Sequence, residues 1–232
     1  MKKKIVVTGG AGRFGEILKK QKSPNKIFFP KINELDICNY KKIRSYLIKT
    51  KPDIVIHLAG LSRPMDQHEK NISKSINLNI IATCNLVMVC SELNIKIIYF
   101  STSYVYPGKK GNYKENDPVL PWNNYAWSKL GGECAVQMYK NSLILRVCMT
   151  EKPFVHKKAF TNVKLNFIFH EEVAKILFKI LNKKGIINLG GEIKTVYNFV
   201  KKYNPNIKKI KSNGTYPPRP YMNISKLKKL VF

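Results

Sequence analysis

The chain is 232 residues long and 44% hydrophobic, which is enough for one large domain or for one domain with a small appendage. No apolar run is long enough to span a bilayer, and residues 1–5 do not open a secretory signal, so we expect a cytoplasmic protein without a membrane span. The formal net charge of +28 comes from lysines spread along the whole chain, which argues against a specific nucleic-acid partner but would help to gather a substrate that carries a diphosphate.

Short apolar runs alternate with longer amphipathic segments along most of the chain. Strands are expected at 5–7, 26–29, 53–57, 95–100, 143–147 and 186–189. Helices are expected from about residue 13 and at 40–49, 71–93, 125–139, 171–181 and 195–202. Continuously apolar strands separated by helices predict a parallel sheet covered on both faces. Right-handed crossovers then give an α/β fold of the Rossmann-type, doubly wound class.

The regular alternation weakens after Val147. Residues 148–169 are expected to be irregular, and the tail at 204–220 is expected to be mostly loop because prolines cluster there. The five cysteines are scattered and form no C-x-x-C pair. The sequence therefore predicts neither a disulfide framework nor a metal site.

A glycine-rich turn follows the first predicted strand. Gly9, Gly12 and Gly15 have the spacing G-x-x-G-x-x-G, and a helix begins beside them. Such a turn brings the backbone close to a pyrophosphate, and the helix N-terminus points its free N–H groups at the anion. Because the triplet lies between a strand and a helix, it predicts a dinucleotide site.

The end of the second predicted strand bears on the choice of dinucleotide. An acidic residue there would grip the ribose hydroxyls of NAD, but Pro30 and Lys31 occupy the place. Lys31, together with Arg13, could accept a 2′-phosphate, which favours NADP and leaves NAD possible. The alternative is that both side chains simply face water.

Tyr125 and Lys129 form a candidate proton-transfer pair. They are four residues apart at the start of a predicted helix, so they share one face about one turn apart. A phenol has a pKa of about 10, and both a neighbouring ammonium and an oxidised nicotinamide favour the phenolate. Lys129 could also bind the nicotinamide ribose. A hydroxyl in the preceding loop, 100–107, could bond a substrate carbonyl oxygen and stabilise the developing alkoxide.

These motifs resemble the extended short-chain dehydrogenase/reductase family, also described as the NAD-dependent epimerase/dehydratase superfamily. The resemblance covers most of the chain and places the catalytic hydroxyl on Thr102, with Ser103 beside it in the substrate site. It also matches Asp36-Ile37 to an adenine contact and Leu58-Ala59-Gly60 to the loop under the cofactor. The cofactor residues implied are Gly9, Gly12, Arg13, Phe14, Gly15, Lys31, Asp36, Ile37, Leu58, Ala59, Gly60, Asn79, Tyr125 and Lys129.

Within the family, residues 109–118, 125–133 and 219–227 look most like the dTDP-4-dehydrorhamnose reductase group. The resemblance implies domains at 1–150 (NAD(P)-binding, completed by a strand near 186–190) and at 151–185 with 191–232 (substrate-binding lobe). The stretch between Val147 and His170 is shorter than usual in the family, so the lobe is expected to be reduced. Arg219 could clamp a substrate diphosphate or be a solvated loop residue.

The expected function is reduction of a nucleotide-linked keto-sugar with NAD(P)H, in the biosynthesis of surface-polysaccharide sugars. The expected partner is the nucleotide sugar, and a homo-oligomer is possible. A dehydratase is disfavoured because Ser103-Tyr104 stand where an acid–base Asp-Glu pair is needed. Two alternatives stay open: an NAD-retaining nucleotide-sugar epimerase, and a non-catalytic NADP-binding regulator.

Overall fold

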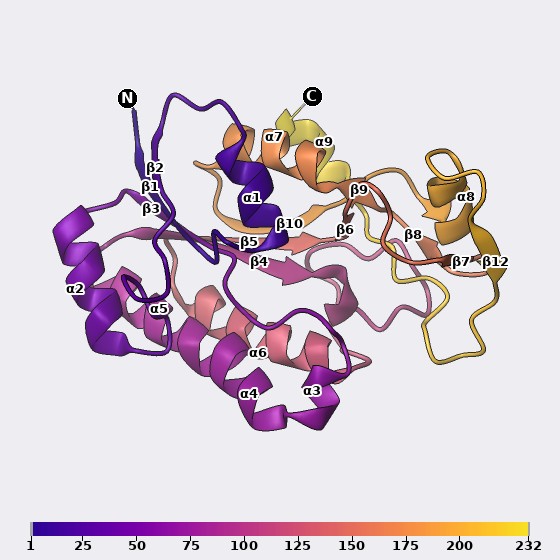
Figure 1. Ribbon diagram of the computed structural model, residues 1–232, viewed down its shortest axis with the longest axis horizontal. Coiled ribbons are helices and arrows are strands. Elements are labelled where there is room, and N and C mark those ends of the chain that lie inside the picture. Colours follow the sequence, from indigo (N-terminus) through magenta and orange to yellow (C-terminus); the bar gives the residue numbers. More distant parts are fainter. Residues whose placement is uncertain (1, 232) are drawn as a thin grey trace. The chain divides into compact units, whose positions relative to one another are not determined.

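The computed structural model describes residues 2–231, so the outermost residues of the two predicted domains, 1 and 232, lie outside it. Within the described residues a six-stranded sheet has the order β10-β5-β4-β3-β1-β2 (Figure 1). The pairs β1–β2, β1–β3 and β3–β4 run parallel. The α/β, doubly wound fold predicted from the sequence is confirmed. The strands are β1 (Lys4–Thr8), β2 (Lys26–Phe28), β3 (Ile54–His57), β4 (Lys96–Thr102), β5 (Ser142–Val147) and β10 (Gly185–Leu189).

The order of the strands locates the switch point of the sheet. β1 lies between β2 and β3. After β1 the chain adds β2 on one side, and it then adds β3, β4 and β5 on the other side. In open α/β sheets, ligands bind beyond the carboxyl ends of the strands at such a point. The glycine-rich turn leaves β1 at this end, directly after Thr8.

The chain forms two compact units. Unit 1 comprises Met1–Ser101, Asn123–Leu145 and Leu181–Ile186, and unit 2 comprises Thr102–Trp122, Arg146–Ile180 and Ile187–Phe232. The units therefore interleave in sequence, and residues 102–122 belong to unit 2 although they precede residue 150. The assignment of a cofactor domain and a substrate lobe stays a prediction.

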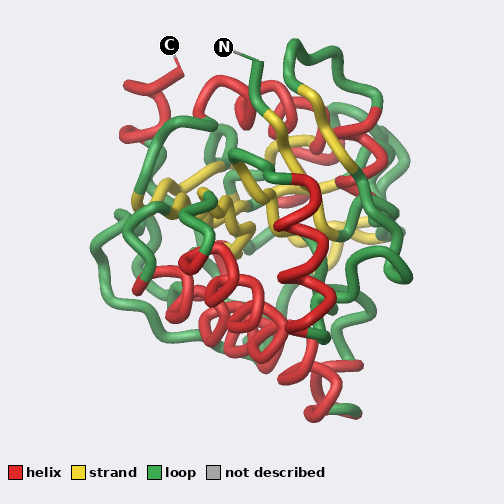
Figure 2. The backbone as a smooth tube through the Cα atoms, turned by 90° about the vertical axis from the view of Figure 1, so that its left-hand side faces the viewer, coloured by secondary structure: helices red, strands yellow, loops and turns green. Residues whose placement is uncertain are grey.

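Unit 1 is organised by a core on the faces of its strands. The buried strand residues Val6, Val55 and Ile97 join one apolar cluster with Leu47 and Leu86 from the covering helices. In Figure 1, α1 lies on one face of the sheet and α2, α5 and α6 lie on the other, and Figure 2 shows strands and helices by colour. These helices are α1 (Arg13–Lys19), α2 (Tyr40–Thr50), α5 (Ala82–Glu92) and α6 (Asn124–Met138).

The long helix expected at 71–93 is present but interrupted. It consists of α4 (Ile72–Ile76), a π-helical segment η1 (Asn77–Ile81) and α5, and the short helix α3 (Gln67–Lys70) precedes it. By length and composition alone, Ile72–Glu92 is the one helical run among residues 2–231 that could cross a membrane. The sequence had suggested that no run was long enough. Leu86, Val89 and Cys90 are completely buried in the core, as in a core helix of a globular domain.

Unit 2 contains short strands where the sequence suggested irregular structure. β6 pairs with β9, β7 with β12 and β8 with β11; the tail is therefore not all loop. α7 packs against α9. The elements are η2 (Ser103–Val105), β6 (Met149–Thr150), β7 (Lys158–Phe160), β8 (Lys164–Leu165), β9 (Ile168–Phe169), α7 (His170–Ile180), β11 (Lys194–Thr195), α8 (Val196–Lys201), β12 (Lys208–Ile210) and α9 (Ser225–Val231).

Candidate cofactor and proton-transfer site

The glycine turn is tight because its backbone touches the loop after β3. Gly9 has a φ of +71°, and a Cβ there would lie 2.6 Å from the Ala59 nitrogen. The Gly9 carbonyl accepts a hydrogen bond from the Gly12 N–H at 2.9 Å. A Cβ on Gly15 would lie 2.5 Å from the Gly10 oxygen. Side chains at Gly9 and Gly15 would therefore push these segments apart.

The N-terminus of α1 is open to an anion. Gly12 is the N-cap, it is exposed, and no side chain caps the first turn. The backbone N–H groups of that turn can therefore point at a phosphate. Phe14 is buried and packs against Phe100 with ring centroids 5.1 Å apart. Of Phe14, only the backbone is available to a cofactor.

The two candidate phosphate-binding cations are both exposed. The guanidinium of Arg13 donates to the Ser62 hydroxyl at 3.3 Å. The backbone N–H of Lys31 donates to the Glu34 carboxylate at 2.8 Å. Asp36, expected near adenine, accepts a hydrogen bond from the Cys38 N–H at 2.9 Å, so its carboxylate shapes the turn in which it stands. Its neighbour Ile37 is buried.

Below the glycine turn, a buried histidine links β1, β3 and α5. Nδ1 of His57 lies 2.8 Å from the Thr8 hydroxyl, and Nε2 lies 3.0 Å from the Thr83 hydroxyl. Thr83 donates its hydrogen to the Asn79 carbonyl at 2.8 Å, so it accepts from Nε2–H and Thr8 donates to Nδ1. Burial, and then the charge of Lys129, lower the pKa of His57 to about 3. His57 is a neutral structural group.

Asn79 joins the loop after β3 to α6. Its Oδ1 accepts from the Leu61 N–H at 2.7 Å, and its Nδ2 donates to the Leu61 carbonyl at 2.9 Å and to the Ser128 hydroxyl at 2.8 Å. It lies in the π-helical segment η1, and such segments are frequent at functional sites. A Cβ on Gly60 would lie 2.7 Å from its Oδ1. Asn79 therefore fixes the loop and uses its amide in doing so.

Tyr125 and Lys129 lie one turn apart in the first half of α6. The Asn123 side chain caps this helix by accepting from the Ala126 N–H. Tyr125 is half-buried, whereas Lys129 is 9% exposed. The Lys129 Nζ lies 4.1 Å from the centre of the Tyr99 ring, and the Tyr99 hydroxyl donates to the Lys129 carbonyl at 3.0 Å. The predicted pair thus shares one helix face, with its amine directed inward.

The electrostatics of Lys129 suit proton transfer near neutral pH. Burial lowers the pKa of Lys129 to about 7, while the carboxylate of Glu133, one further turn along α6, acts in the opposite direction. Glu133 is completely buried and accepts a hydrogen bond from the Ser101 hydroxyl. The amine can therefore change its charge close to neutral pH.

His68 is a residue of this region that the sequence analysis missed. It is 1% exposed, and its ring lies edge-on to Tyr125 with centroids 5.2 Å apart and an interplanar angle of 63°. Its Nδ1 lies 2.7 Å from the Ser75 hydroxyl. A lone histidine in a stretch without a predicted helix gave no signal, because α3 is only four residues long.

The remaining candidates belong to unit 2. Thr102 and Ser103 are buried at the end of β4 and the start of η2, and the Thr102 hydroxyl accepts from the Tyr104 N–H at 3.2 Å. The Thr102 hydrogen remains able to donate. Arg219 is exposed, and its backbone N–H donates to the Gly108 carbonyl at 2.8 Å. Tyr104 packs with Trp122 and Tyr216, with ring centroids 4.8 to 5.7 Å apart.

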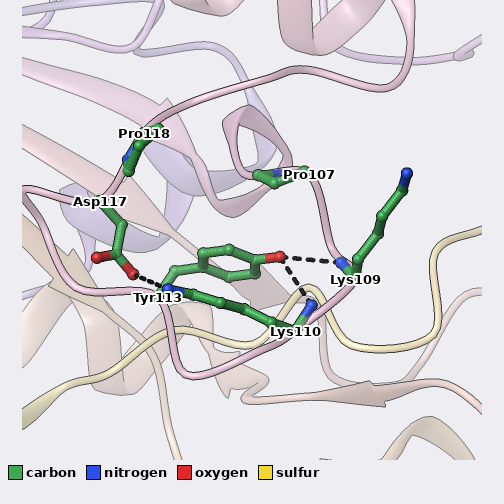
Figure 3. Close-up of a pocket in the computed structure, with 6 residues that line it drawn as sticks. All are labelled: Pro107, Lys109, Lys110, Tyr113, Asp117 and Pro118. Atoms are coloured by element: carbon green, nitrogen blue, oxygen red, sulfur yellow. Dashed lines mark hydrogen bonds and ion pairs between the residues drawn. The ribbon is translucent and has the colours of Figure 1, made fainter.

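The segment at 107–118 folds around Tyr113 (Figure 3). The Tyr113 hydroxyl accepts from the backbone N–H groups of Lys109 and Lys110 at 2.9 and 3.0 Å, and the Lys110 ammonium pairs with Asp117 at 3.2 Å. A cavity of about 290 Å³ lies here. Its small size and internally paired polar groups indicate a scaffold for this loop.

One hydrogen-bonded path connects the end of β1 to two of the predicted site residues of unit 1, Asn79 and Tyr125. It runs from Thr8 through His57 and Thr83 to Asn79, and from there to Ser128, whose hydroxyl donates to the Tyr125 carbonyl at 2.8 Å. Among residues 2–231, no cluster of three or more His, Cys, Asp or Glu could hold a metal ion.

Comparison with known proteins decides the family. The family described as "RmlD substrate binding domain" matches residues 2–175. The chain belongs to this family. It is 31% identical over 152 residues to dTDP-4-dehydrorhamnose reductase of Aggregatibacter actinomycetemcomitans, a match that covers 63% of this chain and 51% of that protein. It is 30% identical over 158 residues to methionine adenosyltransferase 2 subunit beta of Danio rerio, a match that covers 62% of this chain and 47% of that protein.

A solved structure extends the likeness of fold to almost the whole RmlD-like chain. The crystal structure of dTDP-4-dehydrorhamnose reductase from Bacillus anthracis in complex with NADP superposes with a TM-score of 0.89 at 20% identity, covering 99% of this chain and 92% of that one. By sequence, in contrast, the chain spans about half the length of the curated relatives it matches. The resemblance to the short-chain dehydrogenase/reductase class, and to this reductase group within it, is confirmed.

Proposed function

We propose that this protein is an NAD(P)H-dependent reductase of a nucleotide-linked keto-sugar, similar to dTDP-4-dehydrorhamnose reductase. The observation that carries the proposal is the pair on α6: a half-buried phenol, Tyr125, one helical turn from a buried amine, Lys129, whose pKa burial lowers to about 7. A relative of that name, 31% identical over the matched region, supports the substrate class.

The glycine turn fits a dinucleotide. The uncapped first turn of α1, which begins directly after the exposed Gly12, offers backbone N–H groups to a pyrophosphate. Arg13 and Lys31 are exposed cations that could receive a 2′-phosphate, which is why we favour NADP over NAD. The loop Leu58–Ala59–Gly60, fixed by Asn79, would support the cofactor from below.

Each residue of the proposed site would then have its own role in the reaction. Bound NADPH would supply the hydride. Tyr125 would give its phenolic proton to the keto oxygen, and Lys129 would lower the pKa of that phenol and bind the nicotinamide ribose. Thr102 would donate its hydroxyl hydrogen to the same oxygen as negative charge develops there. Ser103 and Arg219 would contact the substrate, Arg219 through its diphosphate.

The test uses the purified protein, NADPH and a panel of nucleotide-linked keto-sugars. We expect NADPH consumption with at least one sugar and a fall of about 10²- to 10⁴-fold for Tyr125→Phe. Tyr139→Phe, at the other end of α6, is the matched control and should keep the activity. An epimerase would instead carry bound nicotinamide after purification and show no net consumption.

A second candidate is a non-catalytic, NADP-binding regulatory subunit. The observation that favours it is the 30% identical relative whose name describes a subunit of methionine adenosyltransferase 2. Such a protein would bind NADP without turning over any sugar, and Tyr125→Phe would leave its ligand binding unchanged. Absence of turnover across the panel, together with that binding result, would favour this candidate over the reductase.

A further inference from the structure

The segment before α4 places a buried imidazole against the proposed proton donor. His68 lies in α3, is 1% exposed, and meets the Tyr125 ring edge-on at 5.2 Å and 63°. Tilted aromatic pairs at this separation attract each other beyond simple burial. The contact therefore restricts the directions in which the phenol can point.

Both partners of this contact are held by further bonds. The Ser75 hydroxyl on α4 lies 2.7 Å from His68 Nδ1, which fixes the plane of the imidazole. Asn124, the residue before Tyr125, donates its amide to the His68 carbonyl at 3.4 Å and to the Glu69 carboxylate. The short helix α3 is thus tied to the first turn of α6 on the side where Tyr125 lies.

The imidazole of His68 is a buried polar ring beside the proposed proton donor. Its Nδ1 faces the Ser75 hydroxyl, and its buried Nε2 reaches no partner in good hydrogen-bond geometry, although the Ser62 backbone acts on the ring. Burial has the largest effect on the ring and lowers the pKa of His68. Glu69, the Ser62 backbone and Lys129 also act on it. Burial thus favours the uncharged form of the ring beside the phenol.

We propose that His68 is a positioning residue for Tyr125, which holds the phenol ring in the orientation that proton transfer requires. The proposal rests on the function proposed above, in which Tyr125 is the proton donor. His68 acts through Tyr125 and needs no contact with the substrate. Ser75 acts one step further back, because it fixes the imidazole.

The test places 3-fluorotyrosine at position 125 and records fluorine NMR spectra of the free protein and of three variants. His68→Phe keeps a ring, His68→Ala removes it, and Ser75→Ala frees the imidazole. We expect a well-defined resonance in the wild type and in His68→Phe, and a shifted or broadened one in His68→Ala, with Ser75→Ala between them. The control carries 3-fluorotyrosine at position 99. Tyr99 lies in β4 and bonds to Lys129 of α6, so it reports general disturbance of that helix. His68→Ala should leave its resonance unchanged.

Activity gives the second readout. With NADPH and the accepted keto-sugar, kcat of His68→Ala should fall about 10- to 100-fold, as for a misplaced reacting group, without loss of NADPH affinity, and His68→Phe should restore most of it. An unchanged resonance at position 125 in His68→Ala, or equal effects of His68→Phe and His68→Ala, would overturn the proposal. A wild type that reduces no sugar but shows the expected spectral differences would refute the proposed function alone.

Discussion

Replacing Lys129 by methionine should change how the stability of the protein depends on pH. Burial lowers the pKa of Lys129 to about 7 in the folded protein, whereas an unfolded lysine has a pKa of about 10.4. Between these values the unfolded chain binds more protons, so the Lys129 contribution to the free energy of unfolding rises with pH. The cost of burying the ammonium is fully present below pH 7 and is relieved as the pH rises toward 10.

The size of this effect follows from the shift. One unit of pKa corresponds to about 1.4 kcal/mol, and the folded lysine loses its proton only gradually around pH 7. From pH 7 to pH 9 the free energy of unfolding of the wild type should therefore gain about 2 kcal/mol relative to Lys129→Met. Methionine fills a similar volume and tolerates contact with the Tyr99 ring, so the variant should fold.

Urea unfolding of cofactor-free protein at several pH values measures this difference. Lys140→Met, at an exposed position just after α6, is the matched control and should follow the wild type. Because only the change with pH is compared, a constant loss of packing in the variant cancels. Parallel pH dependences for the wild type and Lys129→Met would refute the argument that burial depresses the pKa of this amine.

Three further substitutions test the glycine turn, the choice of cofactor and the core of unit 2. Gly9→Ala should cost at least about 1–2 kcal/mol in urea unfolding because of its positive φ, and it should weaken NADPH binding; unchanged values of both would contradict the tight turn. Lys31→Glu should raise the dissociation constant for NADPH but not for NADH in fluorescence titrations, and equal effects would show that Lys31 only faces water. Asn188→Ala removes a buried amide that donates to the Tyr113 carbonyl at 2.8 Å and should cost about 1–3 kcal/mol of unfolding free energy, whereas a neutral result would mean that water replaces the amide.

The sheet was predictable from sequence because its strands are continuously apolar and bounded by clear breaks. Val6, Val55 and Ile97 are buried on a sheet that helices cover, so their pattern leaves little choice of structure. The glycine turn was equally readable, since Gly9 and Gly15 stand where a Cβ would strike backbone. Both features are encoded by residues adjacent in the chain.

Features that depend on contacts between distant segments were not predictable. The π-helical segment at Asn79 interrupts a run that reads as one continuous helix, and its reason is the set of bonds to Leu61 and Ser128. The two-residue strands of unit 2 are too short to leave a periodic pattern. The position of His68 depends on its contacts with Ser75 and Tyr125, which form only in the folded chain.

The proposed function requires Tyr125 and Lys129 to face a nicotinamide that the glycine turn holds. A crystal structure of the protein soaked with NADP tests it most directly. We expect the pyrophosphate at the first turn of α1, with the phenol of Tyr125 and the amine of Lys129 facing the nicotinamide and its ribose. A cofactor bound elsewhere, or a Tyr125 hydroxyl turned away from the nicotinamide, would contradict it.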